Sequence, residues 1–141
     1  MNTLLDLDLS HKRVLLRVDL NTPIQDYKIS DDERIVRSLP TIRHILENNG
    51  KLTLLSHLGR PEENGVIQVK YSLKPVAQRL GELLDLEVNL FDSIEEWSEP
   101  DSGNLNMLEN VRFLKGEKSN NPSLSRRLAE MCDIFVMDAF A

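Results

Sequence analysis

The stretch Leu52-Thr53-Leu54-Leu55-Ser56-His57-Leu58-Gly59-Arg60-Pro61 places an imidazole, a bare glycine backbone and a guanidinium directly after an apolar run. The apolar run has the composition of a buried strand. In open α/β sheets, ligands bind beyond the carboxyl ends of the strands, and the planar guanidinium of Arg matches a phosphate or carboxylate with two hydrogen bonds. The stretch therefore fits an anion site, although a turn that uses the Gly for a positive φ and the Pro for stiffness explains the same residues.

The same arrangement, an apolar run followed by polar residues, recurs along the chain. It is seen at Arg13–Val18, Leu105–Leu108 and Ile134–Met137, and Glu87–Phe91 is a further strand candidate. Because the carboxyl ends of parallel strands meet at one edge of a sheet, we expect the polar residues after these strands to share one neighbourhood. These residues are Asp19, Asn21, His57, Arg60, Asn110, Arg112 and Asp138.

Segments with the apolar spacing of helices lie between the strands. The first covers Ile35–Leu46, with Asp31 and Asp32 as N-cap candidates and Gly50 as a stop just past its end. Pro40 interrupts this segment, and we expect it to kink the helix or to start a second one, because proline lacks an N–H and clashes with the preceding turn.

Three other segments complete the pattern of alternating strands and helices. A helix is predicted over 72–84, with Ser72 as its cap and Pro75 in its first turn. A second helix is predicted to begin at Pro122, and a short helix is predicted over Ser93–Trp97. This alternation predicts an α/β fold, a Rossmann-like doubly wound parallel sheet with helices on both faces, formed as a single domain over residues 1–141.

Composition excludes several classes of protein. The chain has 141 residues, 40% of them hydrophobic, a net charge of −6 and one cysteine, Cys132. We therefore expect one core, no general binding of nucleic acid, and no internal disulfide, which suits a reducing cytoplasm. No run approaches the roughly 18 apolar residues of a membrane span, so we expect no membrane association.

Signatures for nucleotides and metals are missing from the sequence. The six glycines do not form the G-x-G-x-x-G pattern or a Walker A loop. The three histidines do not have metal-ligand spacing with each other or with Cys132. We therefore expect no cofactor-binding residue and no metal ligand in this chain.

Several motifs together resemble the amino-terminal half of the phosphoglycerate kinase family. The resemblance covers the whole chain in order and spacing, and its motifs are Asp6-Leu7-Asp8-Leu9, Arg17-Val18-Asp19-Leu20-Asn21-Thr22-Pro23, Arg34-Ile35, Leu39-Pro40-Thr41-Ile42, Ser56-His57-Leu58-Gly59-Arg60-Pro61, Leu108-Glu109-Asn110-Val111-Arg112-Phe113 and Asp138-Ala139-Phe140. Each motif alone is weak, but coincidence does not explain so many in register.

The resemblance implies a cytoplasmic glycolytic enzyme that transfers a phosphoryl group between 1,3-bisphosphoglycerate and ADP, giving 3-phosphoglycerate and ATP. Mg²⁺ would accompany ATP or ADP in a carboxy-terminal half that this chain lacks. The resemblance also implies that Asp19 and Asn21 contact the glycerate, and that Arg34 reaches the transferring group as the catalytic residue. The cradle for the substrate phosphate would come from the segment that holds His57, Leu58, Gly59 and Arg60, together with Arg112.

Other polar residues fit structural roles. We expect Arg17 to pair with a carboxylate or to cap the sheet edge, and Asp138 to support the site rather than bind substrate, whereas Glu109 stays open between the two roles. His11 stands where the family usually has Gly in the turn before the first strand, which should affect local stability rather than the site.

The end of the sequence also departs from the family pattern. The chain stops at Ala141, before the helix that should cover the last strand, so we expect it to be truncated, with an apolar face left exposed. We expect the full-length protein to be a monomer and the 141 residues alone not to turn over. The alternatives are a stand-alone, non-catalytic binding module for a phosphorylated small acid, and a piece that folds only with a partner.

Overall fold

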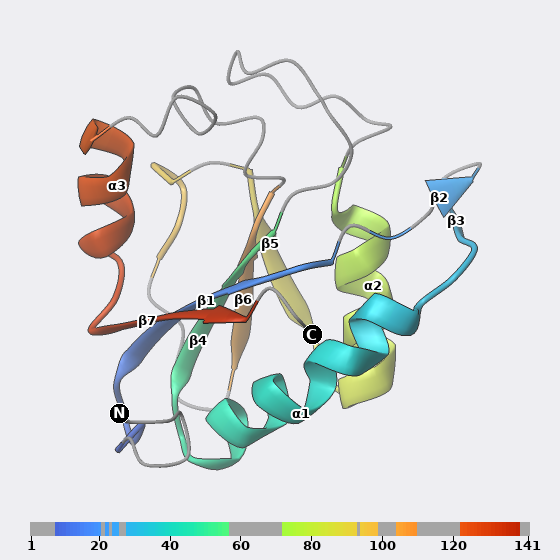
Figure 1. Ribbon diagram of the computed structural model, residues 1–141, viewed down its shortest axis with the longest axis horizontal. Helices are drawn as coiled ribbons and strands as arrows, with labels where there is room; N and C mark the ends of the chain where they lie inside the picture. The colour runs from blue at the N-terminus through green and yellow to red at the C-terminus, as the bar shows by residue number, and fades with distance from the viewer. Residues whose placement is uncertain are drawn as a thin grey trace.

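A five-stranded parallel sheet forms the centre of the molecule (Figure 1), in the strand order β5-β6-β4-β1-β7. The computed structural model describes residues 8–20, 22, 24–25, 28–56, 72–92, 94–98, 104–109 and 122–138. The strands of this sheet are β1 (Arg13–Val18), β4 (Lys51–Leu55), β5 (Val88–Phe91), β6 (Leu105–Leu108) and β7 (Ile134–Asp138). The predicted parallel α/β architecture is therefore confirmed.

Within the described residues, three helices connect the strands. They are α1 (Glu33–Glu47), α2 (Lys74–Leu84) and α3 (Pro122–Ala129). Two short strands, β2 (Ile24–Gln25) and β3 (Lys28–Ile29), form an antiparallel pair between β1 and α1 that the sequence did not predict.

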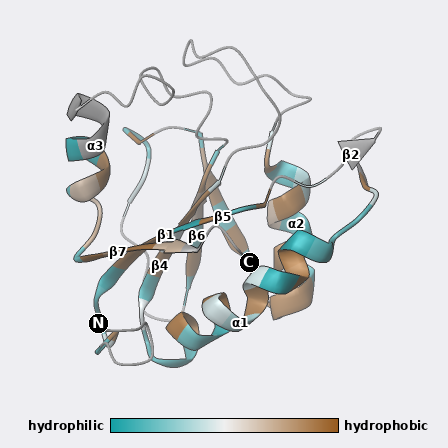
Figure 2. Ribbon diagram, viewed as in Figure 1, coloured by the Kyte–Doolittle hydropathy of each residue, from teal (hydrophilic) through white to brown (hydrophobic). Residues whose placement is uncertain are grey.

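The sheet has a hydrophobic layer on each face, because successive side chains of a strand point to opposite sides. On the first face, Val14, Leu16 and Val18 of β1 belong to a core cluster with apolar residues of α1 and α2. On the second face, Leu15 packs with Leu55 and with residues at the end of α3. Figure 2 shows hydrophobic residues along the strands and within α1 and α2. Helices therefore cover both faces, as predicted.

Helix α1 is one continuous helix of 15 residues, so the predicted second helix at Pro40 is wrong. Pro40 lies on the exposed side of α1, where the carbonyl group that loses its N–H partner can bond to water. At the N-terminus, the Glu33 N–H donates to Asp31 Oδ1 at 3.0 Å, whereas Asp32 holds the cap position without a side-chain cap bond.

The C-terminus of α1 closes in a Schellman arrangement. Asn49 takes the left-handed conformation at φ 61°, its N–H donates to Leu46 O at 3.1 Å, and Gly50 N–H donates to Ile45 O at 2.9 Å. Gly50 is needed for a different reason from the one predicted. A Cβ at Gly50 would lie 2.6 Å from Ile45 Cγ2 and 3.0 Å from Ile45 O, so the close approach of the chain, rather than its φ, requires glycine.

The other predicted elements differ only in detail. Leu73 holds the N-cap position of α2 without a side-chain cap bond, so the predicted cap at Ser72 is wrong by one residue, although Ser72 Oγ accepts the Lys74 N–H at 3.1 Å. Pro75 lies in the first turn, as predicted. Residues 94–96 form a turn closed by the Trp97 N–H and Ile94 O at 3.2 Å, so the predicted short helix there is wrong.

Strand β7 forms one edge of the sheet and exposes two large apolar side chains. Phe135 is 49% exposed and Met137 is 64% exposed, which agrees with the expectation that an apolar face of this strand is left exposed. Within the described part of the chain, none of the helices combines the length and the apolarity that a bilayer crossing requires.

Candidate functional site

The central strands bring three polar chain segments to the carboxyl edge of the sheet. Strands β6, β4 and β1 are neighbours, and the residues that follow them begin with Glu109, Ser56 and Asp19 respectively. The chain continues from β4 into α2 on the first face and from β6 toward α3 on the second face. A point where neighbouring strands lead to opposite faces is the usual ligand crevice of an open α/β sheet.

Asp19 and Arg34 form an ion pair beside this edge. Asp19 follows β1, Arg34 lies in the first turn of α1, and Arg34 Nη1 donates to both carboxylate oxygens of Asp19, at 2.9 and 2.8 Å. Both side chains are partly exposed, so the pair contributes little to stability. The main effect of this ion pair is to hold the Arg34 guanidinium at the end of β1.

Ser56 fastens the segment after β1 to the end of β4. The Leu20 N–H donates to Ser56 Oγ at 3.0 Å, and Ser56 is buried. The side chain of Leu20 is fully buried, so Leu20 holds the backbone in place directly after Asp19. From the sequence alone, Ser56 stands out only as part of its motif, with no sign of this role.

Glu109 is a buried carboxylate that joins the end of β6 to the start of α2. It is 5% exposed, and its oxygens accept the Ser72 hydroxyl at 2.7 Å and the Leu73 N–H at 2.6 Å. A carboxylate is favourable at a helix N-terminus, where the backbone N–H groups carry partial positive charge. Backbone amides at a helix N-terminus often bind phosphate in this class of fold. Here the Leu73 N–H is instead bonded to the carboxylate of Glu109.

The predicted site residues fall into two groups. Asp19 and Arg34 are described, and the structure brings them together. The remaining predicted ligands, Asn21, His57, Leu58, Gly59, Arg60 and Arg112, lie outside the described residues, as does Asn110. Arg17 aligns with Leu55 and Met137 in the sheet register. Asp138 is the last residue of β7 and pairs in register with Val18.

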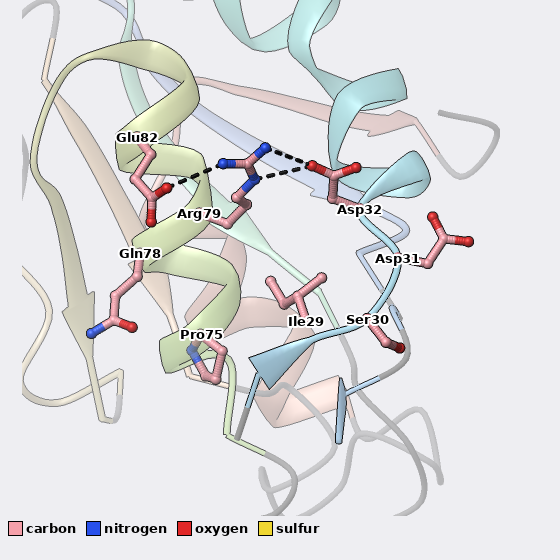
Figure 3. A pocket seen from close by; sticks show the side chains of 8 residues that line it. All are labelled: Ile29, Ser30, Asp31, Asp32, Pro75, Gln78, Arg79 and Glu82. Atoms are coloured by element: carbon pink, nitrogen blue, oxygen red, sulfur yellow. Dashed lines mark hydrogen bonds and ion pairs between the residues drawn. The ribbon is translucent and has the colours of Figure 1, made fainter. Parts of the chain in front are cut away.

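A polar cavity of about 580 Å³ lies between the turn that precedes α1 and helix α2. Arg79 crosses it (Figure 3), with Asp32 Oδ2 at 3.0 Å from its Nε and Glu82 Oε2 at 3.1 Å from its Nη1. The hydrogen bond to Asp32, followed by that to Glu82, holds the pKa of Arg79 above its ordinary value. These contacts connect the start of α1 to α2 and engage the carboxylate of Asp32, which stands at the N-cap position of α1 but makes no side-chain cap bond.

The opposite edge of the sheet carries a structural ion pair. Arg13 Nη2 lies 3.1 Å from Asp133 Oδ1, and the Arg13 N–H donates to Asp133 Oδ2 at 2.9 Å. Hydrogen bonds from Arg13 hold the pKa of Asp133 below its usual range. Burial raises the pKa of the neighbouring Cys132 thiol, which favours an unreactive, packed side chain.

Among the described residues, no group of three or more His, Cys, Asp or Glu side chains is placed to hold a metal ion.

The fold defines a class of open, parallel α/β proteins, in which ligands usually bind beyond the carboxyl ends of the strands. The family model described as phosphoglycerate kinase matches residues 4–141. The chain therefore belongs to the phosphoglycerate kinase family.

Individual relatives agree with this assignment. The chain is 52% identical over 135 residues to the phosphoglycerate kinase of Vibrio campbellii and 49% identical over 136 residues to that of Coxiella burnetii. Each alignment covers 96% of this chain but only 35% and 34% of the respective relative. The chain thus spans about a third of the length of these relatives.

Solved structures show the same relation. The structure of phosphoglycerate kinase from Coxiella burnetii superposes with a TM-score of 0.91 at 48% identity, over 97% of this chain and 35% of that one. Phosphoglycerate kinase from Pyrococcus horikoshii gives a TM-score of 0.83 at 35% identity, over 100% of this chain and 37% of that one.

Proposed function

We propose that this chain is a substrate-binding domain that takes 3-phosphoglycerate and 1,3-bisphosphoglycerate at the carboxyl edge of its sheet. The observation that carries the proposal is the Asp19–Arg34 pair, held at 2.8 to 2.9 Å beside the ends of β1, β4 and β6. Membership of the phosphoglycerate kinase family supports this choice of substrate.

The chemistry of the substrate matches the predicted set of residues. A phosphoglycerate carries a phosphate at one end and a carboxylate at the other, so its pocket needs separated cations, together with an acceptor and an amide for the hydroxyl. Asp19 and Asn21 would supply the last two groups. The phosphate would be bound by His57, Arg60 and Arg112, with Leu58 and Gly59 completing the segment after β4.

The whole protein would transfer a phosphoryl group between 1,3-bisphosphoglycerate and ADP. Charge in the transition state of such a transfer is spread over the equatorial oxygens, so catalysis depends on positioning and on electrostatic stabilisation. Arg34 would supply positive charge to that group. No general base is needed, because the acceptor carboxylate is already ionised near neutral pH.

The ion pair of Arg34 has a consequence for this mechanism. Asp19 accepts both hydrogen bonds from Nη1 of the guanidinium and keeps it at the end of β1. The other terminal nitrogen, Nη2, is the donor that a substrate oxygen would then meet. Asp19 would therefore aim the guanidinium as well as contact the glycerate.

The remaining expectations belong to the whole protein. We infer that Mg²⁺ accompanies ATP or ADP on a nucleotide-binding domain outside these 141 residues. We also infer that the protein works as a monomer in the cytoplasm, without nucleic-acid or membrane partners. The net charge of −6 supports the absence of nucleic-acid binding.

Chemical-shift mapping with 3-phosphoglycerate tests where the ligand binds. The proposal predicts shifts of the backbone amides of Leu20, Ser56 and Glu109, at the carboxyl edge. Arg13 and Asp133, at the opposite edge, should not shift. A response centred on Arg13 and Asp133, or no response at saturating ligand, would contradict the proposed site.

A further inference from the structure

Arg34, the residue that would meet the transferring group, lies in a stretch of chain without buried side chains. Residues 30–34 are exposed or half-buried, and Ile35 is the first buried residue of α1. The first N–H groups of a helix have no acceptor within the helix, and helix ends tend to fray. Polar contacts must therefore help to hold the first turn of α1 in place.

Arg79 of α2 reaches this end of α1 (Figure 3). Its Nε and Nη2 lie 3.0 and 2.9 Å from one oxygen of Asp32, Oδ2. Asp32 stands at the N-cap position of α1, and its C=O accepts the Val36 N–H at 2.9 Å, which is the first hydrogen bond of the helix. Arg79 therefore holds the residue from which α1 starts.

Helix α2 gives Arg79 a firm base. Val76 and Leu80 of this helix are fully buried in the core. Glu82, three residues after Arg79, accepts a hydrogen bond from Arg79 Nη1 at 3.1 Å. Because the guanidinium is planar and rigid, it can bond two carboxylates at once in a fixed geometry. The core thus sets the position of Arg79, and Arg79 sets that of Asp32.

A short path leads from Asp32 to the candidate site. Arg34 follows Asp32 by two residues and lies in the first turn of α1, and its Nη1 donates to both oxygens of Asp19 at 2.9 and 2.8 Å. The backbone of Arg34 is thus tied to α2 through Asp32, while its side chain is tied to the end of β1.

We propose that Arg79 is a positioning residue, which fixes the first turn of α1 and thereby places the Arg34 guanidinium at the end of β1. The inference rests on the proposed function, because Arg34 supplies positive charge to the transferring group there. Catalysis by positioning is sensitive to distance, and a misplacement of about 1 Å can cost a factor of about 10². Arg79 acts through Arg34 and does not itself touch the substrate.

Three variants separate this role from a general effect on the helix. Arg79→Ala removes the contacts to Asp32 and Glu82. Arg79→Lys keeps the charge but loses the planar fork, and it serves if Arg79→Ala does not fold. Arg37→Ala is the matched control, because Arg37 Nη2 pairs with Glu33 Oε1 at 2.6 Å near the same end of α1, but both residues belong to α1 and do not tie it to α2.

Steady-state kinetics of the whole enzyme give the functional readout. Arg79→Ala should lower kcat about tenfold and leave the KM for 3-phosphoglycerate within about threefold of the wild type. Arg79→Lys should lie between the two, and Arg37→Ala should match the wild type. In an Arg34→Ala background, Arg79→Ala should have no further effect on kcat, because the residue through which it acts is gone.

Relaxation of ¹⁵N nuclei in the purified protein gives a readout that does not depend on activity. The order parameter of the Arg34 backbone amide should be near that of rigid backbone, about 0.85, in the wild type and in Arg37→Ala. It should be clearly lower in Arg79→Ala, because the first turn of α1 is then free to fray.

The outcomes distinguish this inference from the proposed function. An unchanged kcat in Arg79→Ala, a loss that appears in KM alone, or an equal loss in the Arg34→Ala background would overturn the positioning role. An Arg34 order parameter that is the same in Arg79→Ala as in the wild type would also overturn it. If the wild-type enzyme transfers no phosphoryl group, the proposed function fails, and the relaxation measurement still decides whether Arg79 fixes the first turn of α1.

Discussion

Thr22 carries a buried hydroxyl for which the described part of the chain offers no hydrogen-bond partner. The residue is 4% exposed, and no partner for its Oγ1 is found among the described residues. Its backbone N–H is satisfied by Leu20 O at 2.8 Å, so only the side chain is affected. Because valine has nearly the same shape and no hydroxyl, we expect Thr22→Val to stabilise the fold.

The size of the effect follows from the burial of the hydroxyl. A buried polar group without a partner costs about 1 to 3 kcal/mol, and Thr22→Val removes that cost without opening a cavity. Unfolding entropy of about 2.1 cal/mol/K for each residue makes 1 kcal/mol equivalent to roughly 3.4 °C in a chain of this length. Thermal unfolding followed by circular dichroism should therefore show a Tm about 3 to 10 °C higher.

The same substitution at Thr53 provides a control of opposite sign. Thr53 is also buried, but its Oγ1 accepts the Trp97 Nε1–H at 2.9 Å. Thr53→Val would leave that N–H unpaired and should lower the unfolding free energy by about 1 to 3 kcal/mol. An unchanged or lower Tm for Thr22→Val would refute the reasoning, because it would mean that the hydroxyl has a partner such as an ordered water.

Three further predictions concern function, pH and backbone strain. In the whole enzyme, Arg34→Ala should mainly lower kcat and Arg60→Ala should mainly weaken substrate binding; steady-state kinetics in which Arg34→Ala changes only KM would contradict this assignment. The lowered pKa of Asp133 means that its pairing with Arg13 stabilises the fold fully above about pH 4, and that this stabilisation fades as the pH falls through the lowered pKa. Asp133→Asn should therefore be less stable than the wild type at neutral pH in urea unfolding, with a difference that shrinks below about pH 4; a difference independent of pH would contradict the pairing. His11 has a left-handed backbone conformation at φ 60°, which is strained for a residue with a side chain, so His11→Gly should raise the unfolding free energy by about 0.5 to 1 kcal/mol. A decrease in the unfolding free energy in the same assay would show that contacts of the His11 side chain matter more than the strain.

The positions of strands and helices were largely predictable, because they depend on local patterns. The apolar runs at β1, β4, β6 and β7 and the spacing in α1 and α2 gave the correct elements. Pro40 misled the prediction because a sequence does not reveal that the residue faces water, where a helix tolerates it. The pair of β2 and β3 escaped detection because strands of two residues carry no periodicity.

The relations between distant residues were less predictable. Placing polar residues after parallel strands put Asp19 at the carboxyl edge, whereas Arg34 was indicated only by the family resemblance. Neither argument gave a sign that the two residues form an ion pair. The strand order β6-β4-β1, which brings Glu109, Ser56 and Asp19 to one edge of the sheet, depends on tertiary packing rather than on local sequence. Glu109 stayed ambiguous because its partners lie 36 and 37 residues away.

The central claim is that this chain holds a phosphoglycerate site that works apart from nucleotide binding. Calorimetric titration with 3-phosphoglycerate, beside an Arg60→Ala variant and a separate titration with MgATP, tests it most directly. The account predicts that 3-phosphoglycerate binds, that Arg60→Ala abolishes the binding, and that MgATP gives no response. Absence of 3-phosphoglycerate binding, or binding that survives in Arg60→Ala, would contradict it.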